Sequence, residues 1–215
     1  MKIGIITYDV PHKKTQDIML RLIGNDVTVI ATKFKERKKI KTLYEHRPSM
    51  KSHVSTIDLC KHFGFNYIEN NNPYEIIKRL DVGLIGGCGL IETTDCKIIN
   101  SHPAYLPYGR GLDALKWAIY NGYPLGVTTH LINDEVDSGF LIEQKFISVG
   151  YYDSFYSVAM RQYELEIDML VRAINLQVKY KIDNRCLEPH MRMPIELEPI
   201  MMERFNVLRI NSKLF

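Results

Sequence analysis

Short apolar runs rich in β-branched residues alternate with segments of helical periodicity, and this alternation constrains the fold more than any other feature. The strand-like runs are Lys2–Tyr8, Val27–Ala31, 66–68 and Val82–Gly86. Helical spacing of apolar residues fits segments 15–23, 55–63 and 74–80 between them. Because parallel strands need a crossover that is usually a helix, the pattern predicts an α/β fold with an open, mostly parallel twisted sheet flanked by helices.

The second half of the chain continues the pattern less regularly. Strand candidates at 125–132 and 140–148 are joined by an acidic loop at 133–139. Asp153 is a plausible N-cap for a long amphipathic helix that would reach Lys179. We expect one main domain over residues 1–182 and a short helical appendage over 183–215. The appendage has nine Met, Leu, Ile or Phe residues between 191 and 208, so it should pack on the domain or form a homodimer contact.

Composition excludes several classes of protein. The 215 residues are 46% apolar, with a net charge of +3 that gives no indication of nucleic-acid binding. No apolar run approaches the roughly 20 residues of a membrane helix, and the start lacks a signal-peptide layout, so a cytoplasmic protein without membrane partners is expected. The cysteines are scattered without a paired motif, so no metal site is expected: Cys60, Cys88, Cys96 and Cys186.

Residues suited to acyl transfer follow the apolar pair 98–99. Asn100 and His102 lie two positions apart at a strand end, so both side chains can project into the crevice where α/β sheets bind ligands. Asp137 lies in the acidic loop, after the strand that contains His130. An amide donor polarises a carbonyl, an imidazole handles a proton and a carboxylate orients the imidazole. The combination therefore indicates acyl-transfer chemistry.

Four motifs in this region occur in a recognisable order. They are Asn100-Ser-His-Pro-Ala-Tyr-Leu-Pro107, Arg110-Gly111, Gly126-Val-Thr-Thr-His130 and Asp137-Ser-Gly139. Together they resemble the folate-dependent formyltransferases, the 10-formyltetrahydrofolate N-formyltransferases, over about residues 82–147. The chain departs from the family pattern at Ala104, where the family has serine, and at Tyr105, where it has leucine.

The resemblance implies a one-carbon transferase whose catalytic domain covers residues 1–182. It implies that Asn100, His102 and Asp137 are catalytic in moving the formyl group of 10-formyltetrahydrofolate to a primary amine. Asn100 would donate to the developing oxyanion, and His102, with an ordinary pKa of about 6.5, would stabilise charge or relay a proton. The resemblance places the formyl donor on Leu84, Gly86, Gly87, Cys88, Gly89, Leu90 and Ile91 and on Asp134, Glu135 and Val136.

Comparison with the different members of the family reduces the number of possible acceptors. Transfer-RNA formyltransferases have a further C-terminal domain, and the glycinamide ribonucleotide enzymes have a Gly/Ser/Asn-rich phosphate loop where this chain has 8–14. The resemblance is greatest to compact sugar-nucleotide N-formyltransferases, which leaves glycinamide ribonucleotide, another amine or a non-catalytic folate-binding module as alternatives. Candidate acceptor-binding residues are Tyr8, Tyr105, Arg110 and His130, with Tyr108 and the basic run Lys33–Lys41 as further candidates for the base and the diphosphate. His130 could equally be a core residue, Arg110 a loop anchor and the basic run solvated surface.

Overall fold

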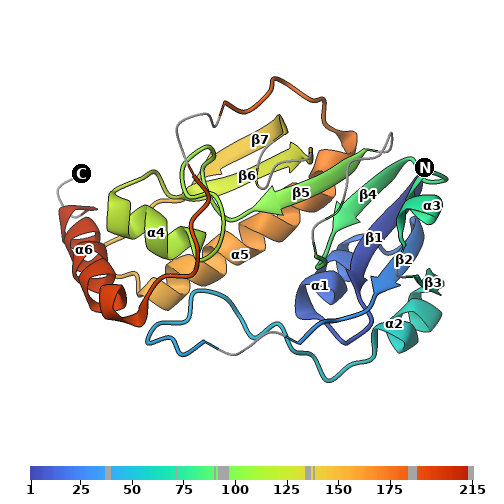
Figure 1. Ribbon diagram of the computed structural model, residues 1–215, viewed down its shortest axis with the longest axis horizontal. Helices are drawn as coiled ribbons and strands as arrows, with labels where there is room; N and C mark the ends of the chain where they lie inside the picture. Colours follow the sequence, from blue (N-terminus) through green and yellow to red (C-terminus); the bar gives the residue numbers. More distant parts are fainter. Residues whose placement is uncertain are drawn as a thin grey trace.

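A seven-stranded sheet forms the centre of the molecule (Figure 1). The computed structural model describes residues 1–36, 40–70, 72–89, 91, 97–133, 137, 139–183 and 188–212. The strands are β1 (Lys2–Tyr8), β2 (Asp26–Thr32), β3 (Asn66–Glu69), β4 (Val82–Ile85), β5 (Ile98–His102), β6 (Gly126–Leu131) and β7 (Phe140–Phe146). Their order across the sheet is β3-β2-β1-β4-β5-β6-β7. Neighbours from β3 to β5 pair in parallel and β6 and β7 add antiparallel pairs, which confirms the mostly parallel α/β sheet.

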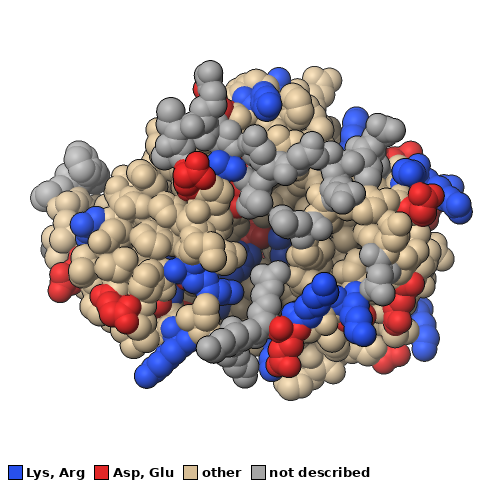
Figure 2. Space-filling view, in the orientation of Figure 1, with Lys and Arg blue, Asp and Glu red and all other residues tan. Residues whose placement is uncertain are grey.

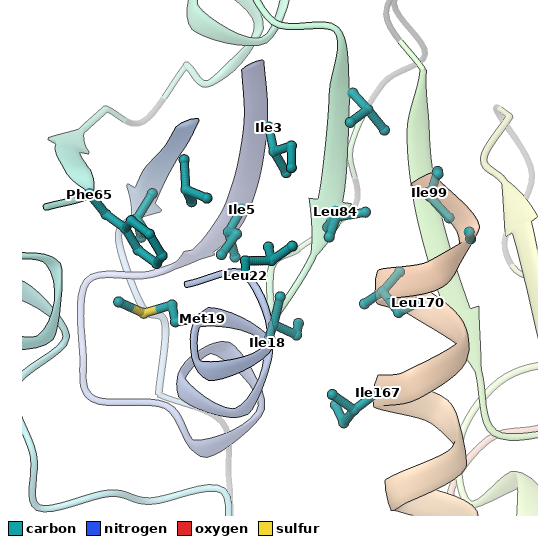
Figure 3. Close-up of a cluster of buried hydrophobic side chains, with 14 of the residues drawn as sticks. Ile3, Ile5, Ile18, Met19, Leu22, Phe65, Leu84, Ile99, Ile167 and Leu170 are labelled. Carbon is teal, nitrogen blue, oxygen red and sulfur yellow. The ribbon is translucent and has the colours of Figure 1, made fainter. Parts of the chain in front are cut away.

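Helices cover the sheet and build the main core. They are α1 (Lys13–Arg21), α2 (Thr56–Phe63), α3 (Tyr74–Ile77), α4 (Ala114–Asn121), α5 (Phe155–Arg172) and α6 (Glu198–Asn211), with 3-10 turns at 173–175 and 195–197. Figure 1 shows α5 running along β5 and β6, and α5 also contacts α1. Between these helices and the strands lies a cluster of buried side chains that includes Ile5, Ile18, Leu84, Ile99 and Ile167 (Figure 3). This packing fixes the end of β5, where the motif residues lie.

The long helix α5 is shorter than expected at its carboxyl end and is capped by a different residue. Its N-cap is Ser154, whose hydroxyl accepts from the Ser157 amide in a capping box, whereas Asp153 pairs with Arg161 at 2.7 Å. The helix ends at Arg172 instead of Lys179. Segment 176–182 instead runs beside β7, and the Lys179 amide donates to the Leu141 carbonyl at 2.8 Å. Because β7 is the last strand of the sheet, its free backbone groups offer this segment partners that a longer helix would leave unpaired.

The C-terminal tail packs against α4, as its apolar residues predict. Met201 and Phe205 of α6 are 0% and 1% exposed, in a second core with Leu115 and Ile119 of α4. Figure 1 shows α4 and α6 beside each other, away from α1 and α2. Among the described residues, no helix combines the length and the apolar character needed to cross a membrane.

Candidate active site

Asn100 and His102 lie on the same face of β5, at its carboxyl end. In the antiparallel pairing with β6, Asn100 is opposite His130 and His102 is opposite Thr128. Alternation along a strand and direct pairing across strands place these four side chains on one face of the sheet. The edge to which β1, β4 and β5 point is also where the sheet order reverses around β1, the usual ligand-binding position in open α/β sheets.

His102 and Asp137 are in contact, although 35 positions separate them in the sequence. The imidazole Nδ1 lies 3.1 Å from Asp137 Oδ1, and the two side chains are 7% and 12% exposed. The other ring nitrogen, Nε2, lies 3.0 Å from the Gly109 carbonyl oxygen. Since both neighbours are acceptors, only a protonated imidazole donates a hydrogen bond to each of them. The two contacts therefore suit a doubly protonated imidazole at His102.

Gly111 anchors the carboxylate of Asp137 from the opposite side. The Gly111 amide donates to Asp137 Oδ2 at 2.7 Å. Gly111 has a φ of +89°, and a Cβ built on it would lie 2.3 Å from the His190 carbonyl oxygen. Next to it, the Leu112 amide donates to that same carbonyl at 2.8 Å, and the His190 amide donates to the Arg110 carbonyl at 2.8 Å. The tail therefore pairs with the loop that holds the Asp137 carboxylate.

A cavity of about 350 Å³ opens beside His102. Figure 2 shows a hollow near the middle of this face, with basic side chains at its floor and along one rim. The cavity is lined by Thr42, Glu45, His46, Arg47, His102, Pro103, Gly111, Leu112, Asp113, Ala114 and Arg192. The sequence reasoning missed His46, Arg47, Asp113 and Arg192, because charged residues in irregular segments carry no periodic or motif signal.

Buried charge surrounds this cavity. Arg47 pairs with Glu166 of α5, which is 1% exposed and lies 2.7 Å from Lys14 Nζ. Burial alone would raise the pKa of Glu166, but the charges of Arg47 and Lys14 hold it below its usual value. His46 lies 3.6 Å from Asp113, and burial lowers the pKa of this histidine to about 4, with Asp113 opposing and Lys116 assisting the shift. His46 is therefore neutral at pH 7.

Residues 84–89, which are expected to bind the formyl donor, make several contacts with side chains of the protein itself. Leu84 is fully buried in the core (Figure 3), so its side chain does not face a ligand. A Cβ on Gly86 would lie 2.9 Å from Thr15, and one on Gly87 would lie 2.8 Å from His12. Only at Gly89 of these three would a Cβ meet nothing within 4 Å. Gly86 thus makes room for Thr15 of α1 and Gly87 for His12 and Tyr8, and a role for these two glycines in binding the formyl donor stays a prediction.

The remaining donor-binding candidates fall into two groups. Cys88 and Ile91 pack against a small core cluster, and burial raises the pKa of the Cys88 thiol to about 12. The Cys88 carbonyl accepts from the Tyr8 hydroxyl at 2.8 Å. Leu90, Asp134, Glu135 and Val136 lie outside the described residues.

The expected acceptor-binding residues do not line the cavity beside His102. Tyr105 stacks on Phe146 with ring centroids 4.2 Å apart, and Tyr108 contacts Tyr123 at 5.2 Å. His130 is 1% exposed and Arg110 is 7% exposed. In the basic run, Lys33, Lys35 and Lys41 are exposed and residues 37–39 lie outside the described part of the chain. Cationic groups from other segments occupy the cavity wall instead.

Comparisons with known proteins agree with the geometry. Residues 82–174 match the family model for formyl transferases. A dTDP-4-amino-4,6-dideoxyglucose formyltransferase of Mycobacterium tuberculosis is 33% identical over 103 residues, which cover 45% of this chain and 43% of that protein. A phosphoribosylglycinamide formyltransferase of Bacillus subtilis is 35% identical over 81 residues, 37% of this chain and 42% of that protein. The matches thus span less than half of these relatives' lengths.

Solved structures extend the likeness of the fold along most of the chain. A sugar N-formyltransferase from Shewanella sp. superposes with a TM-score of 0.62 at 19% identity, covering 95% of this chain and 87% of that one. A phosphoribosylglycinamide formyltransferase from Bacillus halodurans gives a TM-score of 0.57 at 17% identity, covering 81% and 93%. These structures confirm the fold, and the match of residues 82–174 to the family model confirms the resemblance read from residues 82–147.

Proposed function

We propose that this chain transfers the formyl group of 10-formyltetrahydrofolate to the amino group of a nucleotide-linked amino sugar. The contact between His102 and Asp137, beside Asn100 and at the mouth of an open cavity, is the observation that carries the proposal. These three residues lie inside the segment that matches the formyl transferase model. The assignment of their catalytic roles is part of the proposal.

The three side chains divide the chemistry among them. As the amine attacks, negative charge develops on the formyl oxygen. The Asn100 amide stabilises this charge by donating a hydrogen bond, and a cationic His102, whose ring N–H groups face Asp137 and Gly109, stabilises it through its positive charge. The attacking nitrogen loses a proton, which Asp137 accepts directly or through a water. The carbon–nitrogen bond to the folate then breaks, and the folate nitrogen regains a proton. The Gly111 amide keeps the Asp137 carboxylate in place throughout.

The formyl donor supplies the transferred carbon, and we infer that it binds next to β5. Strands β4 and β5 are parallel neighbours, so the segment after β4 lies at the same edge of the sheet as Asn100 and His102. At Gly89 the backbone is open on the side where a Cβ would stand. A flat ring can approach the backbone there, whereas Gly86 and Gly87 are closed by protein atoms.

Support for a sugar nucleotide as acceptor comes from the relatives and from the cavity. One relative is named as a formyltransferase of a dTDP-linked amino sugar, and the structure with a TM-score of 0.62 is a sugar N-formyltransferase. The loop after β1 uses backbone amides within the protein, since the Asp9 amide donates to the Thr32 carbonyl and the Lys13 amide to the Met50 carbonyl, both at 2.8 Å. It therefore resembles no phosphate-binding nest. Glycinamide ribonucleotide remains the second candidate, because a relative of similar identity acts on that class.

The test is release of tetrahydrofolate from 10-formyltetrahydrofolate with a panel of amines. The panel contains nucleotide-linked 3-amino and 4-amino sugars, glycinamide ribonucleotide and charged initiator transfer RNA. Turnover with a sugar nucleotide is expected, and Asn100→Ala, His102→Ala and Asp137→Asn should each lower kcat by about a hundredfold. His62→Ala, at an exposed histidine, is the matched control. Turnover of only glycinamide ribonucleotide or transfer RNA would refute the acceptor, and folate binding without turnover of any amine would favour a binding module.

A further inference from the structure

Two arginines from segments outside the sequence motifs face the same cavity as His102. Arg47 belongs to the irregular segment 40–55 before α2, and Arg192 belongs to the tail before α6. We propose that Arg47 and Arg192 together bind the phosphate groups of the acceptor, and that the tail therefore completes the acceptor site. This inference rests on the proposed function, since it assigns the anionic part of the same substrate to named residues.

Arg47 has most of its hydrogen-bonding capacity free for a ligand. A guanidinium has five N–H donors. Within the described part of the chain, the only hydrogen bond of Arg47 is the one from Nη2 to Glu166. Glu166 also pairs with Lys14 at 2.7 Å, so two cations share one buried carboxylate and a positive charge remains. The side chain of Arg47 lines the cavity and is 29% exposed, and its guanidinium also lies over the Tyr163 ring, 5.9 Å from the ring centroid.

Arg192 is held on another part of the wall by the residue that precedes α4. Its Nη1 lies 3.2 Å from Asp113 Oδ1, and the side chain is 46% exposed. The other oxygen of Asp113 accepts from the Met193 amide at 3.1 Å. Asp113 therefore fixes the backbone beside Arg192, while the exposed guanidinium keeps donors for a ligand.

The other charged groups of the cavity do not cancel this donor surplus. The carboxylates in the lining are Glu45, which is exposed, and Asp113, both of whose oxygens already face donors. His46 contributes no charge at neutral pH. Phosphates bind best where several guanidinium N–H groups converge, because each pair of parallel bonds fixes both position and orientation. A volume of about 350 Å³ is within the usual range for small-molecule sites.

The tail also holds the segment that carries Arg47. Glu198, the first residue of α6, accepts from the Leu43 amide at 2.7 Å and the Tyr44 amide at 2.9 Å. It also accepts from the Thr42 hydroxyl and from Lys116 Nζ, both at 2.7 Å. Residues 42–44, which precede Arg47 closely in the chain, are thus tied to α4 and α6 by one buried carboxylate. Through Arg192 directly and through Glu198 indirectly, the tail contributes to both cationic parts of the wall.

The experiment compares Arg47→Gln and Arg192→Gln with the unchanged protein. The KM for the nucleotide-linked amino sugar should rise by about tenfold to a hundredfold, with kcat within about threefold, because the lost contacts bind the ground state and the transition state alike. Calorimetry with uridine diphosphate, thymidine diphosphate and inorganic pyrophosphate should show affinity falling by the same factor. Arg79→Gln, at an exposed arginine after α3, should change neither quantity.

A second variant covers the case in which Arg47→Gln fails to fold. Arg47→Lys keeps a charge beside Glu166 but loses the planar fork, so it should fold and still bind diphosphates several-fold more weakly. Equal KM and equal diphosphate affinity in folded Arg47→Lys and Arg192→Gln would overturn the inference, as would an unchanged protein that binds none of the three probes. Weaker probe binding in the variants supports the anion site even if the panel of amines shows that the acceptor is not a sugar nucleotide.

Discussion

At the scale of single residues, Gly111 joins the features on which the candidate site depends. Its amide donates to Asp137, and its flanking residues pair with the tail at His190. The backbone there has a φ of +89°, which L residues with a side chain rarely adopt. A single glycine thus couples the carboxylate, the loop after β5 and the tail.

Replacement of Gly111 by alanine should impair both stability and turnover. The new Cβ would lie 2.3 Å from the His190 carbonyl oxygen, so the backbone must shift. We expect a loss of at least about 2 kcal/mol in the free energy of unfolding and a tenfold to hundredfold lower kcat as Asp137 moves. Gly24→Ala is the matched control, because Gly24 has a φ of +88° with no atom within 4 Å of the added Cβ. Equal losses in both variants would contradict a role for the contact with His190.

Two histidines whose pKa values are strongly lowered, His12 and His46, predict how stability depends on pH. Burial, assisted by Lys14 and Arg47, lowers the pKa of His12 from 6.5 to about 4, and burial lowers that of His46 to about 4. Between these values the unfolded chain binds more protons than the folded one. The free energy of unfolding should therefore fall as the pH drops from 6.5 toward 4, by up to about 1.4 kcal/mol per pH unit for each histidine. Denaturant titrations over this pH range measure the free energy of unfolding. His46→Gln should make its dependence on pH less steep, whereas His62→Gln should not.

At the scale of secondary-structure elements, buried ion pairs join segments that share no strand pairing. Lys116 of α4 and Glu198 of α6 lie 2.7 Å apart, and both side chains are 1% exposed. Burial alone would raise the pKa of Glu198, but Lys116, Thr42 and the amides of Leu43 and Tyr44 lower it. The pair therefore fixes α6, α4 and segment 42–44 relative to one another.

Removal of one partner of the Lys116–Glu198 pair should lower the free energy of unfolding strongly, because the other charge stays buried without its counter-charge. Lys116→Met is expected to lower the free energy of unfolding by about 3 kcal/mol. Lys78→Met is the matched control, since Lys78 and Glu75 form an exposed pair whose removal should cost less than about 1 kcal/mol. Urea titrations of both variants give the comparison. A loss in Lys116→Met as small as that in the control would show that Glu198 is held by its other donors alone.

At the scale of the whole molecule, the tail is structurally integrated with the rest of the chain. Met201 and Phe205 fill the core against α4, and Trp117 of α4 donates to the Met191 carbonyl at 2.8 Å. The ring of Trp117 also stacks on His190 at 4.6 Å. Apolar packing, backbone pairing and a buried ion pair therefore all link the tail to α4 and to the loop after β5.

Truncation of the tail should disrupt more than the tail. A chain that stops at residue 183 would expose Leu115 and Ile119, which are 1% exposed in the full chain, and we expect aggregation or loss of cooperative unfolding. A chain that stops at residue 206 retains Met201 and Phe205 and removes mostly exposed side chains, so it should remain folded. Light scattering and thermal unfolding distinguish the outcomes. A monodisperse, cooperatively folding chain of residues 1–183 would contradict this integration.

Local patterns in the sequence determined much of the fold and part of the candidate site. The alternation of strand-like and helical periods gave the mostly parallel sheet, since periods of 2 and 3.6 are read within a few residues. The placement of Asn100 and His102 at the end of β5 followed in the same way. The order of the motifs was sufficient to indicate a formyltransferase.

The motifs already implied that Asp137 lies near His102, and the structure confirms this contact at 3.1 Å. Only the tertiary structure decided the other arrangements across long separations: it ended α5 at Arg172 in favour of pairing beside β7, and it set Arg47 and Arg192 around one cavity. A glycine in the sequence shows that something approaches the backbone, but at Gly86 and Gly87 the approaching atoms belong to the protein. All of these arrangements have the same physical reason. Irregular segments have no period, so the positions of their charges depend on the packing of distant elements and not on neighbours in the chain.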